Sequence, residues 1–525
     1  MRKSIIATLL LSCLLSRGIN SSNILGLFFM PAPSHYAFVR PLLNELTNRG
    51  HNLTVFTVFA DQKLANYREI HVVEGFLPVV LKENSLGETL KEISSFELLK
   101  NVIFKMIPKL KQMQQNERIM ELVNSTDHYD LILTDIVHAE WYTAFAFKFT
   151  APMINIYPNF IFPWFANYIG AGFHPAFVPI LSTGVSFEMS FWERLHNTIV
   201  YMVWMTVGQY YSTIPSEELA RQLFGQIPPL TEIVKNTSMT FINTYPPNYP
   251  SWALPPHVVQ VGGMNIAPVE KLPENLEKFI GESENGVIVF SMGSLFKGSI
   301  HPKKLEAFLY AFSKIPYHVL WKWDGKVSPQ ISSNIMLSKW LPQRDILAHP
   351  KVKLLISQGG LLSINEAIYE GVPILGMPIF GDQRTNIKFL VTNGDAELLE
   401  YNEITKEIVL EKIQKLLYDP KYKTNAGLLS DVFRDRPMSP LDTAIYWTEY
   451  VIRHNGAHHL RTAAVDLSWC QFLLLDVIVF LLAVFSSVLV IVYCAMKSSL
   501  RFVRRFVCSK NSPYSNSKKK YVKHD

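Results

Sequence analysis

Residues 340–386 carry side chains that could hold each part of a nucleotide. The Gly359–Gly360 pair can bring bare backbone N–H groups close to an anion, and a helix predicted over residues 361–369 adds the positive end of its dipole. Glu366 on that helix could accept both hydrogens of a ribose diol, and the indole of Trp340 offers a flat face to a base. The stretch therefore predicts a nucleoside diphosphate site.

The elements that must position these residues are short apolar strands. Strands are predicted over residues 352–356 and 373–377, and each runs out into glycine and small polar residues at its C-terminal end. Residues 287–292 form a similar strand that leads into Gly293 and Ser294, a turn small enough to approach phosphate. Ligands bind at this edge of a parallel α/β sheet, so the pattern predicts a site built from several strand ends.

The order and spacing of these residues resemble the signature of the UDP-glycosyltransferases, with its W-x-P-Q run, His-Gly-Gly turn, helical Glu, Phe-x-Asp-Gln run and upstream F-S-x-G-S run. The resemblance implies that Trp340 stacks on uracil, that Gln343 hydrogen-bonds it and that Gly360 presents its N–H to phosphate. It also implies that Glu366 holds the ribose and that Asp382 and Gln383 hold the sugar. The full set expected to bind the UDP-sugar is Gly293, Ser294, Trp340, Gln343, Gln358, Gly359, Gly360, Ser363, Glu366, Asp382 and Gln383.

One position departs from the signature, because the histidine before the glycine pair is Gln358 here. The glutamine amide is also a hydrogen-bond donor of similar reach. Weakening one such bond to a charged group costs about 1.5–3 kcal/mol, or roughly one to two decades in affinity or rate. Gln358 therefore predicts a weakened or retuned enzyme, and a non-catalytic, membrane-tethered UDP-sugar-binding or partner subunit is the alternative.

The first half opens as a βαβ unit, with strands predicted over residues 24–30 and 52–59 and a helix over 38–49. Its first turn, residues 31–35, lacks G-x-G-x-x-G, so the nucleotide is not expected there. Taken alone, His35 reads as a capping or exposed residue, and Asp135 at the end of the strand 130–135 reads as an N-cap.

The resemblance favours a catalytic role for both residues over those interpretations, because the family has a catalytic pair at these positions. Neutral His35 would take the proton from an acceptor hydroxyl, and Asp135 would hold the other ring nitrogen and stabilise the imidazolium. His138 is a nearby competitor without a counterpart in the family.

The resemblance implies an α/β fold of the GT-B type, two facing Rossmann-like domains with one C-terminal transmembrane helix. The expected segments are a signal peptide (1–22), an acceptor-binding domain (23–245), a proline-rich linker (246–262), a UDP-sugar-binding domain (263–435), a crossing helix (436–460), a membrane span (477–496) and a basic cytoplasmic tail (497–525). An amphipathic helix around 85–115 presents either a solvated face or a membrane-contacting one. The aromatic-rich stretch 169–211 is expected to be core, acceptor pocket or membrane interface.

Charge and cysteine content narrow the class of protein. The net charge is +6, but without the leader and the tail the body carries 38 basic and 43 acidic residues, so a nucleic-acid partner is not expected. The body has no cysteine, so disulfides cannot hold it together. Asn52, Asn124 and Asn236 begin N-x-[ST] sequons, of which Asn124 and Asn236 are the expected glycosylation sites.

The resemblance implies inverting transfer of a hexose from a UDP-sugar to a hydroxyl of a small lipophilic acceptor. UDP-glucose is the preferred donor and UDP-glucuronic acid the second choice, since no cationic partner for a carboxylate can be singled out. No cofactor or metal is expected, because the glycine turn and the helix dipole supply the positive potential. By the resemblance the chain is a detoxification-type glycoprotein of the endoplasmic reticulum membrane, single-pass type I with a lumenal body. A homo-oligomer is left open.

Overall fold

The computed structural model describes residues 21–30, 32–59, 64–72, 115–135, 140–159, 161–180, 183–185, 187–246, 249, 252–293, 300–325, 331–379 and 381–510. The chain divides into two compact units, residues 1–462 and 463–525. The amphipathic helix predicted around 85–115, like His138 and Ser294, lies outside the described residues.

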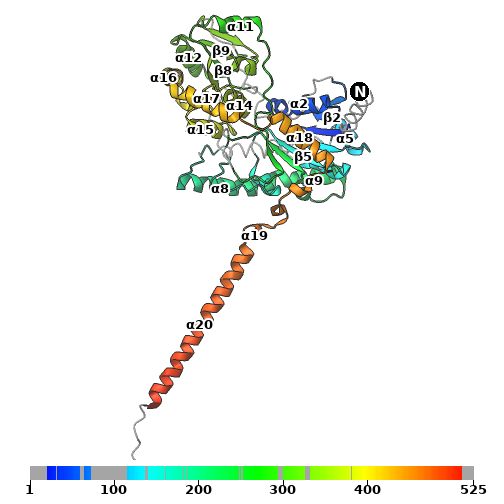
Figure 1. Ribbon diagram of the computed structural model, residues 1–525, viewed down its shortest axis with the longest axis vertical. Coiled ribbons are helices and arrows are strands. Elements are labelled where there is room, and N and C mark those ends of the chain that lie inside the picture. The colour runs from blue at the N-terminus through cyan, green and yellow to red at the C-terminus, as the bar shows by residue number, and fades with distance from the viewer. Residues whose placement is uncertain are drawn as a thin grey trace, which may run out of the picture. The chain divides into compact units, whose positions relative to one another are not determined.

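The first half of unit 1 is built on a seven-stranded parallel sheet of order β3-β2-β1-β4-β5-β6-β7. Figure 1 labels two of its strands, β2 and β5. The strands are β1 (Asn23–Phe28), β2 (Asn52–Thr57), β3 (Tyr67–His71), β4 (Leu131–Thr134), β5 (Met153–Tyr157), β6 (Met239–Ile242) and β7 (Val258–Gln260). The central strands β1, β4, β5 and β6 are almost entirely buried, as expected for a sheet covered on both faces, whereas the edge strands β3 and β7 are partly exposed. Because all strands are parallel, their C-terminal ends meet at one edge. β7 lies within the range predicted as a linker.

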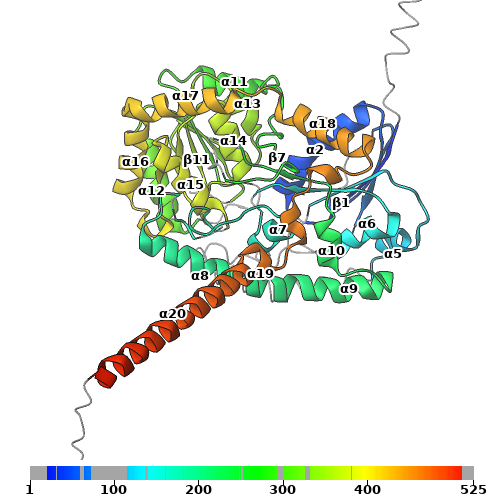
Figure 2. The ribbon, with the colours of Figure 1, turned by 60° about the horizontal axis from the view of Figure 1, so that its bottom comes forward.

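Helices cover both faces of this sheet, and two apolar clusters form the cores on either side. They are α2 (Pro33–Asn48), α5 (Glu117–Asn124), α6 (Ala144–Phe149), α7 (Pro163–Tyr168), α8 (Phe191–Gly208), α9 (Ile214–Phe224) and α10 (Leu230–Lys235). α8 and α9 run end to end (Figure 2) and are joined by one π-helical turn, Gln209–Thr213.

The aromatic-rich stretch 169–211 divides between core and surface. Phe173 and Trp204 are buried in the core of the first half. Phe177, Phe191 and Trp192 are exposed, and Trp192 is 73% exposed at the start of α8. The core interpretation therefore holds for only part of the stretch.

The second half of unit 1 is a six-stranded parallel sheet of order β10-β9-β8-β11-β12-β13. The strands are β8 (Val287–Ser291), β9 (His318–Lys322), β10 (Ile335–Ser338), β11 (Val352–Ser357), β12 (Ile374–Gly376) and β13 (Ala396–Leu398). The helices are α11 (Glu274–Gly281), α12 (Pro302–Ser313), α13 (Gln343–Leu347), α14 (Leu361–Tyr369), α15 (Gln383–Asn393), α16 (Lys406–Tyr418) and α17 (Pro420–Arg434). The strand order reverses between β8 and β11, and this switch point is where such folds bind ligands.

The helix α18 (Pro440–Arg453) returns to the first half and packs beside α2 (Figure 2). Its residues Ala444, Ile445 and Val451 belong to the same core cluster as Leu42 and Leu46 of α2. The predicted crossing helix is thus part of the first half's core.

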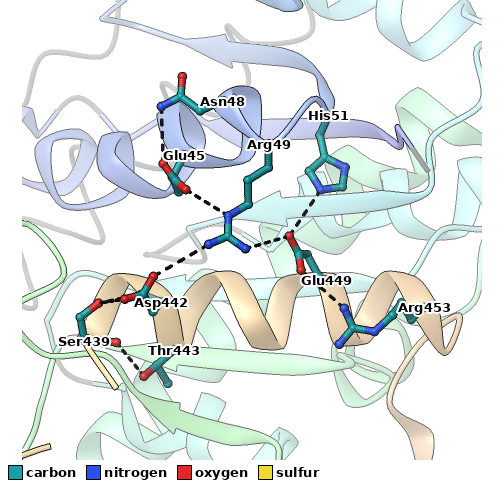
Figure 3. A network of polar contacts seen from close by, with 9 residues as sticks. All are labelled: Glu45, Asn48, Arg49, His51, Ser439, Asp442, Thr443, Glu449 and Arg453. Carbon is teal, nitrogen blue, oxygen red and sulfur yellow. Dashed lines mark hydrogen bonds and ion pairs between the residues drawn. The ribbon is translucent and has the colours of Figure 1, made fainter. Parts of the chain in front are cut away.

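Charged side chains surround this packing (Figure 3). Arg49 at the end of α2 contacts Glu45 at 3.0 Å, Glu449 at 3.4 Å and Asp442 at 3.9 Å. Glu449 also faces His51 and Arg453 at 4.0 and 3.5 Å. We call these six residues the α2–α18 clasp.

Unit 2 consists of α19 (Trp469–Phe472) and α20 (Leu475–Lys510), together with a 3-10 turn. Residues Leu475–Val507 of α20 are long and apolar enough to cross a membrane, and an 18-residue window within them has a mean hydropathy of 2.9. The helix is longer than the predicted span because the basic residues that follow position 496 continue it.

Candidate functional site

The turn after β11 holds the glycine pair that the sequence assigns to phosphate. Gly360 is the N-cap of α14. Gly359 has a φ of +89°, and a Cβ on it would lie 2.6 Å from the Ile387 side chain, so only glycine fits there. The backbone N–H of Gly359 donates to Oγ of Ser357 at 3.3 Å, so the N–H groups that can bind an anion at this turn are those at the start of α14, from Gly360 onward.

Gln358 fills the space between this turn and the end of β8. A Cβ on Gly293 would lie 2.0 Å from Nε2 of Gln358, and a Cβ on Gly360 would lie 3.3 Å from the same atom. The buried Oε1 atom of Gln358 has no hydrogen-bond partner among the residues that the structure describes. The side-chain amide therefore lies between two glycines, and its Oε1 atom is an acceptor that is not in use among the described residues.

Gln343, Ser363 and Glu366 form one hydrogen-bonded group. The Nε2 atom of Gln343, at the start of α13, donates to Oγ of Ser363 at 3.0 Å and to Oε2 of Glu366 at 2.8 Å. The residues expected to contact uracil and ribose are therefore linked to each other by direct contact.

Burial raises the pKa of Glu366 to about 7, although the hydrogen bond from Gln343 and the charge of Arg344 oppose this shift. A ribose diol that donates to the carboxylate would favour its ionised form. If the ribose binds there, its binding and the ionisation of Glu366 would be coupled.

Trp340 lies at the rim of the site with 70% of its surface exposed. The Nζ atom of Lys322 lies 4.7 Å from the centroid of the indole ring. A cation over the ring is attracted by its π electrons, so Lys322 helps to orient the indole. The sequence offers no local signal for Lys322, which comes from the end of β9.

Asn386 joins the predicted sugar-binding residues to the phosphate turn. Its Nδ2 donates to Oδ2 of Asp382 at 2.9 Å and to the carbonyl of Gly359 at 3.1 Å. Gln383 is 4% exposed, and its Oε1 accepts from the backbone N–H of Ile379 at 2.8 Å. Burial raises the pKa of Asp382, and the bond from Asn386 opposes the shift. Asn386 lies one turn after Asp382 on α15, and this spacing is the signal that could have identified it.

His35 and Asp135 meet at the C-terminal edge of the first sheet. His35 lies in the first turn of α2, which begins at Pro33, five residues before the predicted start. Asp135 follows β4 directly, and its Oδ2 lies 4.0 Å from Nδ1 of His35. The hydroxyl of Tyr142 donates to the backbone carbonyl of Asp135. The two side chains are brought together from segments 100 residues apart.

Both members of this pair are buried, with 13% and 2% of their side chains exposed. Burial lowers the pKa of His35 to about 4, and it raises the pKa of Asp135 well above its usual value. The imidazole is therefore neutral at physiological pH, which is the form that accepts a proton.

Glu140 is a buried acid that sequence reasoning missed. It is 1% exposed, and its carboxylate accepts from Ser212 at 3.3 Å and from Thr213 at 3.0 Å, both in the π-helical turn. Burial raises its pKa to about 7, against these hydrogen bonds. The bonds fix the chain beyond Asp135 to the α8–α9 junction.

The two halves of unit 1 touch beside α15, the helix that carries the residues predicted to bind the sugar. Phe187 of the first half packs edge to face on Phe389 of α15, with ring centroids 5.4 Å apart. The pKa of buried Tyr249 is raised by burial and further by the charge of Asp382. Residues of the first half therefore reach α15, which begins next to Asp382.

The sequons differ in their surroundings. Asn124 is exposed at the end of α5. Asn236 is also exposed, but its Oδ1 accepts from Arg461 at 2.8 Å, and its partner Ser238 is buried.

Comparison with known proteins matches residues 27–512 to the family model for UDP-glucoronosyl and UDP-glucosyl transferase. The chain is 47% identical to UDP-glycosyltransferase UGT5 of Dactylopius coccus, over 95% of this chain and 96% of that one. It is 36% identical to UDP-glucosyltransferase 2 of the same organism, over 93% of each. Among solved structures, it is similar to CalG4, the calicheamicin glycosyltransferase, with a TM-score of 0.56, 17% identity, and coverage of 83% of this chain and 99% of that one.

Proposed function

The chain belongs to the UDP-glycosyltransferase family, and we propose that it transfers glucose from UDP-glucose to a hydroxyl group of a small lipophilic acceptor with inversion at the anomeric carbon. His35 acts as the general base, assisted by Asp135. The observation that carries the proposal is the continuous contact from Asp382 through Asn386 to Gly359, which puts sugar-binding and phosphate-binding groups into one unit.

The donor site would hold UDP-glucose through a chain of complementary groups. Trp340 stacks on uracil and Gln343 hydrogen-bonds it. Glu366 holds the ribose. The N–H groups at the start of α14, from Gly360 onward, and the dipole of that helix would stabilise the diphosphate, which is the leaving group, while the N–H of Gly359 donates to Ser357. The charge that develops on UDP as the sugar departs meets a preorganised positive potential there.

Glucose suits the sugar end better than glucuronic acid does. Asp382 would repel a second carboxylate, and the nearby Arg384 is already ion-paired with Glu400 at 2.6 Å. A relative named UDP-glucosyltransferase 2, 36% identical, agrees with this preference. UDP-glucuronic acid is the alternative donor.

In the proposed reaction, His35 accepts the acceptor's hydroxyl proton as the oxygen attacks the anomeric carbon. The resulting imidazolium is disfavoured by burial alone, since burial lowers the pKa of His35 to about 4. Burial also raises the pKa of Asp135, but a positive charge forming on His35, 4.0 Å away, would lower that pKa, and the carboxylate would then offset the cost of the imidazolium once the pair closes to hydrogen-bond distance.

We propose further that α20 anchors the chain in the endoplasmic reticulum membrane with the catalytic body in the lumen. The basic residues at the end of α20 suit a cytoplasmic position. Sequon Asn124, exposed at the end of α5, suits a lumenal glycan.

The test is turnover by membranes that contain the chain, incubated with radiolabelled UDP-glucose and a panel of phenols. Labelled glucoside is expected from the wild-type chain, with almost none from His35→Ala, and excess UDP-glucuronic acid is expected to compete weakly. Binding of UDP without turnover on any acceptor would instead support a membrane-tethered binding subunit, the alternative that Gln358 motivates.

A further inference from the structure

The helix α14 contacts both halves of unit 1. Ser363 and Glu366 lie on the side that meets Gln343 in the donor site. Leu362 packs instead against the core cluster of the first half, which contains residues of α2 and β1. Asn365, one residue before Glu366, is fully buried, and its Nδ2 donates to Oδ1 of Asn243 at 2.9 Å.

Asn243 is itself held on several sides. It follows β6 and is fully buried. Its Nδ2 donates to the carbonyl of Pro158, next to the end of β5, at 2.7 Å, and its Oδ1 also accepts from the N–H of Gly263 at 3.3 Å. The side-chain amide of Asn243, which follows β6, therefore contacts the end of β5, the connection between the halves, and α14.

The placement of this bond gives it a role beyond stability. Asn243 lies at the same C-terminal edge of the first sheet as Asp135, because β4, β5 and β6 are parallel neighbours. Asn365 lies on the helix whose N-terminus would hold the diphosphate. A buried polar pair is satisfied in only one relative arrangement, so it specifies an orientation that apolar packing alone would leave loose.

We propose that the Asn365–Asn243 hydrogen bond is a positioning contact that sets the orientation of the donor-binding half against the half that carries His35. This inference rests on the proposed function and deepens it. Neither asparagine is among the residues expected to bind the donor or the acceptor. They fix the geometry in which the acceptor oxygen on His35 faces the anomeric carbon.

The test compares two chemically identical changes. Asn365→Asp places a carboxylate oxygen against the Oδ1 acceptor of Asn243. Asn155→Asp is the matched control, because Asn155 is also fully buried and donates at 2.9 Å to Thr237, within the first half. Asn365→Ala, which removes the donor without adding a charge, serves where Asn365→Asp does not fold.

Since a misplacement of about 1 Å can cost roughly 100-fold in rate, Asn365→Asp is expected to lower kcat at least about 10-fold while the KM for UDP-glucose and the Kd for UDP change less than about threefold. Asn155→Asp is expected to lower the Tm without this split. Loss of UDP binding in parallel with kcat, or a kcat equal to that of the control, would overturn the proposal.

A second measurement does not depend on turnover. The body contains no cysteine, so spin labels can be placed at Glu121→Cys in the first half and Leu428→Cys in the second once the four native cysteines, Cys13, Cys470, Cys494 and Cys508, are replaced by serine. Both parent side chains are about 60% exposed. Asn365→Asp is expected to shift or broaden the distance distribution between the labels. An unchanged distribution overturns the positioning role, whereas a wild-type chain that binds UDP without turnover overturns only the proposed function.

Discussion

Gln358 and Gly293 share one small volume, so that a single carbon added to the glycine would fall 2.0 Å from the glutamine Nε2. The position before the glycine pair and the end of β8 are therefore one structural unit. Gly293→Ala would force the amide out of this space, and the left-handed φ of +78° would add strain.

Gln358→His is expected to raise kcat/KM for UDP-glucose by about 10-fold, because a histidine can donate a stronger, charge-assisted hydrogen bond to the diphosphate. Gln358→Ala should lower it by a similar factor. Steady-state kinetics with one phenol acceptor measures both. Unchanged or lower turnover in Gln358→His would show that this explanation of the departure from the family signature is wrong.

His35→Ala is expected to lower kcat by about 100- to 10,000-fold, the range typical for loss of a general base. The Kd for UDP should stay within about twofold, since His35 lies in the first half and UDP is expected on the second. Asp135→Asn should retain the folded state and lose part of the rate. UDP titration calorimetry beside single-turnover kinetics separates the two effects. A His35→Ala chain with full turnover would exclude His35 as the base.

Donor binding is expected to weaken as the pH falls through about 7. The folded-state pKa of Glu366 is raised to about 7, so the carboxylate loses its charge below that pH and can accept one hydrogen bond fewer from the ribose. The KM for UDP-glucose should therefore rise on acidification, while Glu366→Gln should show a high KM that is flat with pH. Because burial lowers the pKa of His35 to about 4, this residue stays neutral throughout this range. It therefore does not contribute to the rise of KM on acidification. A rise that persists in Glu366→Gln would assign the titration to another group.

Glu449→Gln is expected to destabilise the first half by about 1–3 kcal/mol, because the partly buried carboxylate holds Arg49 and Arg453 in the α2–α18 clasp. The matched control is Glu121→Gln, whose ion pair with Arg118 is exposed and should contribute at most about 1 kcal/mol. Urea unfolding of the purified chain measures both. Equal effects would show that the clasp is no stronger than a surface ion pair.

Asn124→Gln is expected to remove one glycan, because Asn124 is exposed beside a loop. Asn236→Gln should have an effect only if transfer precedes folding, since Arg461 holds Asn236 and Ser238 is buried in the folded chain. Mobility shifts after treatment with an amidase that releases N-glycans distinguish the two sites.

The sequence predicted the parts of the fold that follow from local pattern. The helix over residues 361–369 has the bounds of α14 because a glycine N-cap starts it and Gly371 follows its end. The two-sheet GT-B architecture is confirmed, and so is the apolar C-terminal helix. The helix α2 begins at Pro33, five residues before the predicted helix. The proline suggests a turn, but proline is equally suited to the first position of a helix.

Contacts between distant segments could not be predicted in this way. Asn243 and Asn365 are separated by 122 residues, and neither lies in a local motif that requires a partner. Glu140 reads as an ordinary surface acid until the π-helical turn supplies its hydroxyl partners. His35 and Asp135 were paired only by resemblance, because only the parallel order of β1 and β4 brings them together.

Because α18 packs into the first half, the core of that half can be completed only late in the synthesis of the chain. Ala444, Ile445 and Val451 are interior residues of the half that begins at β1, yet the ribosome makes them after the whole second half. Part of the apolar interior of the first half therefore stays uncovered until the second half and α18 have been translated. A nascent chain of this type needs protection by chaperones for almost the full length of its synthesis.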